Sequence, residues 1–396
     1  MSRRLLFIAH RMPYPPDKGE KIRAWHILEH LSRRWDVEAG FLVDDRNDLA
    51  HLPVLQRHCA HVEWRPALSR RRTMARALLR VRPGQPLSLG WFHEPGLFRW
   101  AQQGLAEGRY GAAFVYSSAM APYVMGPAAR RPGLVRVLDM VDVDSEKWRA
   151  YAANARTPMR HVWAREARTL LAFERRAALE FDHAIFVSED EAKHFAALAP
   201  EAAPHVGFVD NGVDLARFDP ARDHPNPYQG DAPAIVFTGT MNYRPNIEAV
   251  VWFAEEVLPR LRAAPPAGVA PPEFHIVGTN PAPAVQALAQ RPGVHVTGAV
   301  PDVRPYVAHA AVAVAPLRIA RGIQNKVLEA MAMARPVVAS PQAFEGVRAE
   351  PGRDLLVADG ADATATRVAE VLAGAHPGLG TAARAAVAAG HDWDAT

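Results

Sequence analysis

The sequence predicts an α/β protein with two doubly wound parallel sheets, each in its own domain. Short apolar runs that end in glycine or proline turns alternate with helical patterns, and this alternation is typical of parallel strands joined by crossover helices. It stops in residues 219–234, which are rich in Pro, Asp and Gly, and then begins again. The chain has 396 residues, whereas a single hydrophobic core stops growing at about 250–300 residues.

The first half opens with an apolar run at residues 5–9, followed by turn residues and then a helical pattern from Ile22 to Leu31. This strand–loop–helix order predicts a parallel sheet that is covered on both faces. A long helix is expected at about residues 160–180, and Ser188 is expected to cap another. Further strands of this half are expected at residues 37–43, 113–116, 134–138 and 183–187.

The second half repeats the same alternation. Helices are expected at residues 247–261 and 326–334. Strands are expected at residues 234–239, 274–278, 294–298, 311–315 and 336–339, and the first three end in a glycine. We therefore predict a first domain over residues 1–212, a second over residues 213–380 and a C-terminal segment over residues 381–396.

Composition narrows the class of protein. The hydrophobic fraction of 49% and the charged fraction of 22% are those of a soluble globular chain. The first apolar run is too short for a signal peptide core, and no run reaches the roughly 18 apolar residues of a membrane helix. One cysteine, Cys59, excludes an internal disulfide and a cysteine-based metal site. A reducing, cytoplasmic setting is expected, with no metal and no cofactor.

The chain has a net charge of +4, and only five of its 46 basic residues are lysines.

Residues 67–83 form a basic, partly amphipathic segment with two interpretations. It either lies on the anionic inner face of a membrane, where lipid-linked acceptors reside, or forms a solvated helix. Nucleic-acid binding fits poorly, because this basic cluster stands alone and no aromatic side chains are interleaved with it.

Ligands of open parallel sheets bind outside the carboxyl ends of the strands, so two facing sheets predict a cleft between the domains. The loop from Arg11 to Lys21 follows the first strand and brings Gly19 to the start of a helix. A glycine there lets backbone N–H groups approach a phosphate. The glycine spacing is not that of a dinucleotide site, and an ordinary strand–helix turn is the alternative.

The loop after the first strand of the second half is a second candidate. It contains Gly239, Thr240 and Arg244, and the planar guanidinium of an arginine suits a diphosphate. A solvated loop arginine is the alternative.

The strongest candidate is the stretch from Arg321 to Glu329. Arg321, Gly322 and Ile323 form a loop, and Lys326 stands at the N-terminus of the next helix. A lysine there opposes the helix dipole unless an anion is bound. Glu329 lies one turn further along the same face and can accept hydrogen bonds from a ribose diol. The alternative is a surface lysine–glutamate pair.

A third strand end carries three acidic residues, Asp139, Asp142 and Asp144. They are candidates for a base that acts on an acceptor hydroxyl, for binding of sugar hydroxyls or for a metal. A solvated acidic loop is the alternative.

Several motifs together resemble the retaining GT4 glycosyltransferases. VDNGVDLARF at 209–218 is similar to the interdomain segment of that family, and FTG, IVG and VTG at the strand ends of the second half match its second domain in order and spacing. KVLEAMA at 326–332, followed by PVVA at 336–339, matches as well. PYPPDKG at 13–19 and DVDSEKW at 142–148 resemble a subgroup associated with bacterial exopolysaccharide loci, including exosortase-type loci.

The resemblance implies the GT-B fold, with two Rossmann-like domains, and transfer of a sugar from a nucleotide sugar with retained configuration. The second domain would bind this donor, and the first would bind a glycan or lipid-linked acceptor in exopolysaccharide biosynthesis. Glu329 would hold the ribose and Lys326 the diphosphate, while the backbone of Gly322 and Ile323 would face the donor sugar. Gly19 would approach the phosphates from the first domain.

We expect Lys326, Arg244 and Asp142 to carry the chemistry. The two cations would stabilise the departing diphosphate, and Asp142 would contact the acceptor hydroxyl.

The sequence departs from the family pattern at three places. Arg321 stands where the family has a sugar-binding glutamate, and the acidic cluster at residues 139–144 replaces a histidine of the first domain. The end of the chain, HDWDAT at 391–396, is too short for the family's crossover helix. Two other functions fit the same pattern: a sugar epimerase with the GT-B fold, and a non-catalytic nucleotide-sugar-binding component of a polysaccharide assembly.

Overall fold

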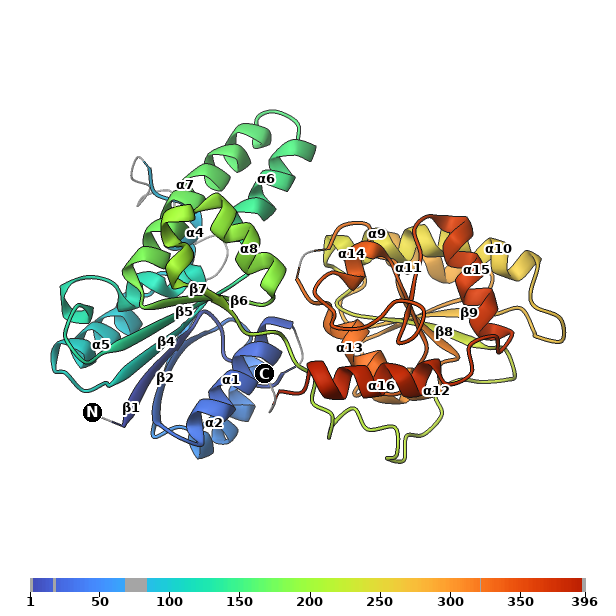
Figure 1. Cartoon of the computed structure of the whole chain (residues 1–396), viewed down its shortest axis with the longest axis horizontal. Coiled ribbons are helices and arrows are strands. Elements are labelled where there is room, and N and C mark those ends of the chain that lie inside the picture. The colour runs from blue at the N-terminus through green and yellow to red at the C-terminus, as the bar shows by residue number, and fades with distance from the viewer. Residues whose placement is uncertain (1–2, 17–18, 68–83, 321, 394–396) are drawn as a thin grey trace. The chain divides into compact units, whose positions relative to one another are not determined.

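The computed structural model describes residues 3–16, 19–67, 84–320 and 322–393. The chain divides into two compact units, Met1–Val209 and Asp210–Thr396. Each unit has a parallel sheet of its own (Figure 1). The first unit thus ends at Val209, whereas the sequence placed the boundary after residue 212.

The sheet of the first unit has seven strands in the order β3-β2-β1-β4-β5-β6-β7, and all neighbours are parallel. The order reverses between β1 and β4, which places the topological switch point at their carboxyl ends. The strands are β1 (Arg4–Ala9), β2 (Asp36–Val43), β3 (His61–Pro66), β4 (Ala112–Tyr116), β5 (Val135–Val141), β6 (His183–Phe186) and β7 (Val206–Phe208).

Helices cover both faces of this sheet, and β1 shows why. Leu5 and Phe7 join one core with Trp25, whereas Leu6 and Ile8 point to the other. A strand that is apolar on both sides needs helices on both sides. The helices are α1 (Gly19–Ser32), α2 (Leu52–His58), α4 (Leu87–Phe92), α5 (Pro95–Ala106), α6 (Asp144–Asn154), α7 (Met159–Glu180) and α8 (Glu189–Leu198).

The sheet of the second unit has six strands in the order β10-β9-β8-β11-β12-β13, again all parallel. Its order reverses between β8 and β11. The two doubly wound sheets that the sequence predicts are therefore confirmed. The strands are β8 (Ala234–Thr238), β9 (Glu273–Val277), β10 (Val294–Gly298), β11 (Val312–Ala315), β12 (Val337–Ala339) and β13 (Leu356–Val357).

The first helix of the second unit begins earlier than its apolar pattern predicts. Tyr243 is extended at the N-cap, and Pro245 in the first turn has the backbone angle that a helix needs. Arg244 is therefore helical, which corrects its expected place in a loop. The helices are α9 (Arg244–Trp252), α10 (Leu258–Ala263), α11 (Pro283–Ala287), α12 (Arg304–His309), α13 (Asn325–Ala332), α14 (Pro341–Phe344), α15 (Ala361–Leu372) and α16 (Leu379–Gly390), with a π-helical turn (Phe253–Val257) between α9 and α10.

The C-terminal residues pack into the second unit. Helix α16 lies against α13. His391 is fully buried, and its ring bonds to the carbonyl oxygen of Asn211 at 3.0 Å and accepts from the backbone N–H of Arg348 at 2.9 Å. The described part of the predicted separate segment 381–396 is thus integral to this unit, because its buried contacts are made there.

No helix in the described part of the chain is long and apolar enough to cross a membrane. Residues 68–83, which hold nearly all of the basic segment 67–83, lie outside the described residues. The predicted membrane contact through that segment therefore stays a prediction.

Candidate functional site

The loops that follow β8 and β11 lie at the switch point of the second sheet. In open parallel sheets, ligands bind outside the carboxyl ends of the strands at such a switch point. The first loop begins at Gly239, and the second leads through Gly322 to α13. The described donor residues that the sequence predicts on these loops, Gly239, Thr240, Gly322 and Ile323, are thus at the same end of the sheet.

Two glycines allow the loops to approach closely. Gly239 has a φ of 153°, and a Cβ on it would lie 2.7 Å from Nδ2 of Asn246 and 3.5 Å from Cε of Lys326. Gly278, at the end of β9, has a φ of 155°, and a Cβ there would overlap the carbonyl oxygen of Gly239. The glycine turns therefore hold the backbone against the lysine that the sequence singled out.

Lys326 is the second residue of α13 and is held from two sides. Its Nζ donates to Oδ1 of the buried Asn246 at 3.1 Å and lies 5.2 Å from the ring centre of Phe237. Asn246 in turn donates to the carbonyl oxygen of Thr240 at 3.0 Å. The side chain of Asn246 thus connects the loop after β8 to the start of α13.

The start of α13 offers hydrogen-bond donors. Among the described residues, the Gln324 side chain makes no capping hydrogen bond. The first N–H groups of a helix have no partner in its regular hydrogen-bond pattern, although that of Val327 donates to the carbonyl oxygen of Gln324 at 2.9 Å. Burial lowers the pKa of Lys326 to about 8, although the nearby Glu329 opposes the shift. Removal of a cation from water at the positive end of a helix is unfavourable, and a bound anion would offset that cost.

Glu329 lies one turn further along α13 and is half-buried. Burial raises the pKa of its carboxyl, whereas the charges of Arg217 and Lys326 oppose the rise. No residue in the described ranges donates a hydrogen bond to this carboxylate. Its oxygens are available to a ligand that carries two hydroxyl groups.

The remaining donor-site predictions fall on the two loops. Gly322 has a φ of 64°, which favours glycine, and its carbonyl oxygen accepts from the side chain of Gln324 at 3.1 Å. Ile323 is buried in the core of the unit. Arg321 lies outside the described residues, so its predicted role in sugar binding stays a prediction.

Arg244 differs from the expectation of a free loop cation. It is the first residue of α9, its side chain is 56% exposed, and its Nε donates to Glu248 at 2.7 Å. This is an (i, i+4) pair on the surface of the helix, which keeps the guanidinium occupied. The structure shows Arg244 in this pair and not on the loop after β8.

The switch point of the first sheet holds His10 and Tyr116, which follow or end β1 and β4. Their rings stack with centres 5.7 Å apart, and the backbone N–H of His10 donates to the carbonyl oxygen of Tyr116. Burial lowers the pKa of His10 and raises that of Tyr116. Within the described ranges, neither His10 Nδ1 nor the Tyr116 hydroxyl has a hydrogen-bond partner. Two buried, unsatisfied polar atoms together favour a bound ligand or water.

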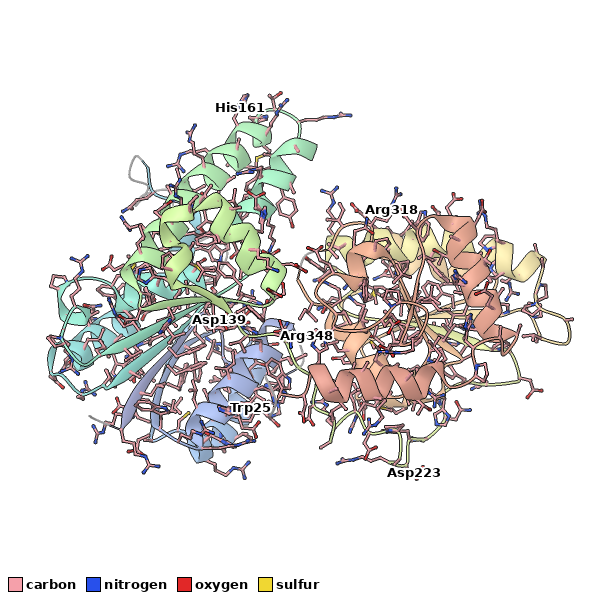
Figure 2. The ribbon with its side chains drawn as sticks, in the orientation of Figure 1. Trp25, Asp139, His161, Asp223, Arg318 and Arg348 are labelled. Carbon is pink, nitrogen blue, oxygen red and sulfur yellow. The ribbon has the colours of Figure 1, made fainter. Side chains whose placement is uncertain are left out.

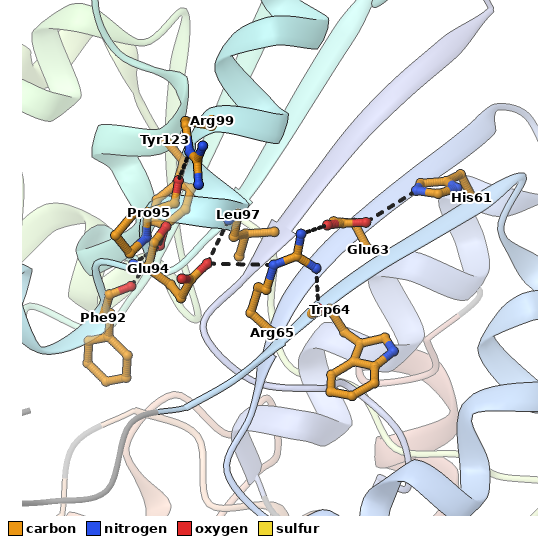
Figure 3. Close-up of polar contacts among 10 residues, drawn as sticks. All are labelled: His61, Glu63, Trp64, Arg65, Phe92, Glu94, Pro95, Leu97, Arg99 and Tyr123. Atoms are coloured by element: carbon orange, nitrogen blue, oxygen red, sulfur yellow. Dashed lines mark hydrogen bonds and ion pairs between the residues drawn. The ribbon is translucent and has the colours of Figure 1, made fainter. Parts of the chain in front are cut away.

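The ring of Phe92 covers His10 from the side, with centres 5.4 Å apart. Figure 3 shows how this segment is fixed. The Tyr123 hydroxyl donates to the carbonyl oxygen of Phe92 at 2.9 Å and accepts from the N–H of Glu94 at 2.7 Å. The Glu94 carboxylate caps α5 through the N–H of Leu97. The wall beside His10 is therefore held by side-chain hydrogen bonds.

Asp139 does not lie in an acidic loop as expected. It is inside β5 (Figure 2), fully buried, and Nε of the equally buried Arg23 lies 2.8 Å from its carboxylate. Arg23 also donates to the carbonyl oxygen of Val209 at 2.7 Å. Burial raises the pKa of Asp139, and Arg23 opposes the rise. These contacts give Asp139 a structural role as the partner of Arg23.

Asp142 and Asp144 do follow the strand end. Val141, the last residue of β5, has a φ of 68°, a strained conformation for a β-branched residue. Burial, together with the charges of Glu191 and Asp144, raises the pKa of Asp142 to about 7. No described residue donates a hydrogen bond to the Asp142 carboxylate. A half-buried carboxylate with such a pKa suits proton exchange near neutral pH.

Gly19 is the first residue of α1 and is exposed. Glu20 follows it and pairs with Arg11. The turn thus already contains a carboxylate at the N-terminus of the helix, where a phosphate would otherwise be favoured. The structure places Gly19 at the predicted helix start, and the described part of this turn, without residues 17–18, shows no feature that is specific to phosphate binding.

Sequence reasoning missed His10, Tyr116, Asn246 and Arg217. His10 directly follows an apolar strand, and that position was the available signal. Local patterns give no signal for Asn246 and Arg217. Asn246 contacts Lys326, and the charge of Arg217 acts on Glu329, and both of these residues are far away in the sequence.

Comparisons with known proteins bear on the fold and on the second unit. Residues 232–374 match the family model described as glycosyl transferases group 1. No curated protein matches the sequence. Sucrose-phosphate synthase from Thermosynechococcus elongatus has a similar structure, with a TM-score of 0.70 at 17% identity over 99% of this chain and 96% of that one.

Two further solved structures have a TM-score of 0.64. HepE from Anabaena, in complex with UDP, is 16% identical over 99% of this chain and 96% of its own. WaaG, a glycosyltransferase involved in lipopolysaccharide biosynthesis, is 13% identical over 97% of this chain and 95% of its own. The predicted fold class is thereby confirmed: the chain has the GT-B fold, and residues 232–374 of its second unit match the glycosyl transferases group 1 model.

Proposed function

We propose that this protein is a glycosyltransferase that moves a sugar from a nucleotide sugar to an acceptor hydroxyl. The observation that carries the proposal is Lys326, a half-buried lysine at the uncapped start of α13 with Glu329 one turn away. The group 1 domain over residues 232–374 covers both residues. HepE, a structural neighbour, has been crystallised with UDP and with UDP-glucose, which makes uridine nucleotides the first donors to test.

The second unit would bind the donor. The diphosphate would meet Lys326 and the N–H groups at the start of α13, while the ribose hydroxyls would donate to Glu329. Gly239 and Thr240 would contribute backbone groups from the loop after β8, and Gly322 would face the sugar. Each of these groups is at the carboxyl end of the sheet, where the fold places its ligands.

The first unit would bind the acceptor. Asp142, with a pKa of about 7, and the neighbouring Asp144 can accept hydrogen bonds from sugar hydroxyls. His10 and Tyr116 supply unsatisfied polar atoms at the switch point of the same sheet. The chemistry fits a glycan or a lipid-linked glycan, and the resemblance to exopolysaccharide enzymes agrees with such an acceptor.

In the reaction, the bond between the anomeric carbon and the diphosphate oxygen breaks, and a bond to the acceptor oxygen forms. Negative charge grows on the departing diphosphate, and Lys326 together with the helix N-terminus stabilises it. The proton of the acceptor hydroxyl passes to the diphosphate oxygen. Attack from the face that the diphosphate leaves would retain the anomeric configuration. We propose no metal ion for this step.

The test is turnover with UDP-, GDP- and TDP-sugars and a set of glycan acceptors, for wild type and Lys326→Ala. We expect acceptor-dependent release of one nucleoside diphosphate and a loss of activity in the variant. Near-wild-type activity of Lys326→Ala contradicts the assignment. Release without an acceptor, together with formation of an epimeric sugar, favours an epimerase, and tight binding without turnover favours a non-catalytic component. The anomeric configuration of the product, read by NMR, tests retention.

A further inference from the structure

Three side chains with metal-binding atoms meet at the amino-terminal ends of β9 and β10. Glu273 and His275 are two residues apart on β9 and therefore lie on the same face of the sheet. His295 lies on the edge strand β10, directly opposite His275 in the register of the two strands. The pairing of the strands thus brings together one carboxylate and two imidazoles from two segments of the sequence.

The distances between the ligand atoms fit a single small ion. Oε2 of Glu273 lies 3.0 Å from Nε2 of His295 and 3.7 Å from Nε2 of His275, and one ligand atom from each of the three residues lies within 4.8 Å of the others. Ligands of a tetrahedral zinc ion, at bond lengths of about 2.0–2.2 Å, stand roughly 3.3–3.5 Å apart. The observed distances from Oε2 of Glu273, 3.0 Å to His295 and 3.7 Å to His275, lie on either side of this ligand–ligand distance.

Surrounding residues fix one histidine and leave the other free to turn. The Tyr228 ring packs on His275 with centres 4.5 Å apart, and the Tyr228 hydroxyl donates to the carbonyl oxygen of Tyr306 at 2.5 Å. The His295 side chain is 48% exposed and stacks on His275 at 4.5 Å with 10° between the rings. Since an ion lies in the plane of each ring that binds it, His295 must turn out of this stack when an ion binds.

We propose that Glu273, His275 and His295 bind a divalent ion of the zinc type. Two imidazole nitrogens and one carboxylate oxygen form a donor set that zinc uses in sites with one open position, and the exposure of His295 leaves that position to solvent. The site is at the opposite end of the strands from Lys326, so it is separate from the proposed donor site. Its role would be to tie the edge strand β10 to β9.

The experiment uses the full chain without a histidine tag, stripped of metal by a chelator that is then removed. Zn²⁺ is titrated by calorimetry, and Co²⁺ is titrated while the visible absorption of the ion is recorded. The variants are His295→Ala and Glu273→Gln. His161→Ala is the matched control, because it removes an exposed histidine on α7 of the other unit.

We expect one ion per chain, visible absorption bands of tetrahedral Co²⁺, and a rise in the melting temperature of wild type on addition of Zn²⁺. His295→Ala and Glu273→Gln should each weaken binding by at least about tenfold, whereas His161→Ala should bind as wild type does. Unchanged nucleotide binding will show that the variants are folded. Absence of saturable binding, or equal binding in wild type and His295→Ala, overturns the proposal and leaves a simple histidine–glutamate hydrogen bond.

Discussion

The pKa of Lys326 makes nucleotide binding depend on pH in a way that can be calculated. Burial sets this pKa at about 8, against an ordinary value of 10.5. A diphosphate in contact with Nζ favours the protonated form, so the bound state holds the proton more tightly than the free state. Affinity must therefore fall as the pH rises through 8. If the bound lysine regains its ordinary pKa, the loss between pH 7 and 9 is about tenfold.

The assay is calorimetric titration with a nucleoside diphosphate at pH 7, 8 and 9, repeated in buffers with different heats of ionisation. At pH 8 half of the Lys326 side chains are unprotonated, so wild type should take up about half a proton for each nucleotide bound. Lys326→Arg is the matched control, because a guanidinium stays protonated throughout this range. Ionisation of the nucleotide contributes equally to the proton uptake of wild type and Lys326→Arg, so it does not affect the difference between them.

Lys326→Met removes the charge altogether. The loss of one charge-assisted hydrogen bond, about 1.5–3 kcal/mol, weakens binding at pH 7 by about 10–150-fold. Unfolding cannot mimic the pH effect, because the sign for folding is opposite. The unfolded lysine holds its proton up to pH 10.5, so this group makes the free energy of unfolding rise between pH 8 and 10.5. Equal pH slopes and equal proton uptake in wild type and Lys326→Arg would refute the reasoning.

Glu329→Gln should weaken the binding of a nucleoside diphosphate by about 10–150-fold, since hydrogen bonds to a charged group are lost. The binding of pyrophosphate, which has no ribose, should be unchanged. Equal losses of affinity for both ligands in calorimetry would contradict a ribose contact. Asp142 accepts hydrogen bonds from an acceptor hydroxyl most strongly when it is ionised, so the turnover rate of wild type should rise with pH through about 7, and Asp142→Asn should abolish this rise. A rise that persists in the variant rules out an acceptor contact of Asp142. Asp139→Ala removes the carboxylate that neutralises the buried Arg23, which should lower the free energy of unfolding by about 3–5 kcal/mol. Urea titration measures this loss, and the double variant Asp139→Ala/Arg23→Met should regain part of the lost stability. A loss below about 1 kcal/mol would refute the structural role, because breaking a buried ion pair costs more than breaking an exposed one.

The sequence was informative wherever local patterns determine the structure. Apolar runs followed by glycine identified β8, β9 and β10, because a buried parallel strand must be apolar and must turn at its end. Lys326 was identified because a lysine at a helix start opposes the dipole, and that conflict is visible in a few residues. The start of α9 was missed because a short polar stretch around Pro245 has no helical period, although proline favours a first turn.

Contacts between distant residues were beyond prediction. Arg23 and Asp139 are 116 residues apart, and Asn246 and Lys326 are 80 apart. Nothing in a single sequence links such partners, since the pairing depends on the order of strands in the sheet. For that reason Asp139 was interpreted as a ligand-binding residue, whereas the structure makes it the partner of a buried arginine.

Donor binding at α13 is tested most directly by a crystal structure with a bound nucleoside diphosphate. We predict difference density for the diphosphate at the start of α13, within hydrogen-bond distance of Lys326 Nζ, and for the ribose hydroxyls on Glu329. The loop at Gly239 and Thr240 should border the diphosphate. Density for the nucleotide at any other place in the chain, with Lys326 and Glu329 left without contact, would rule out donor binding at this site.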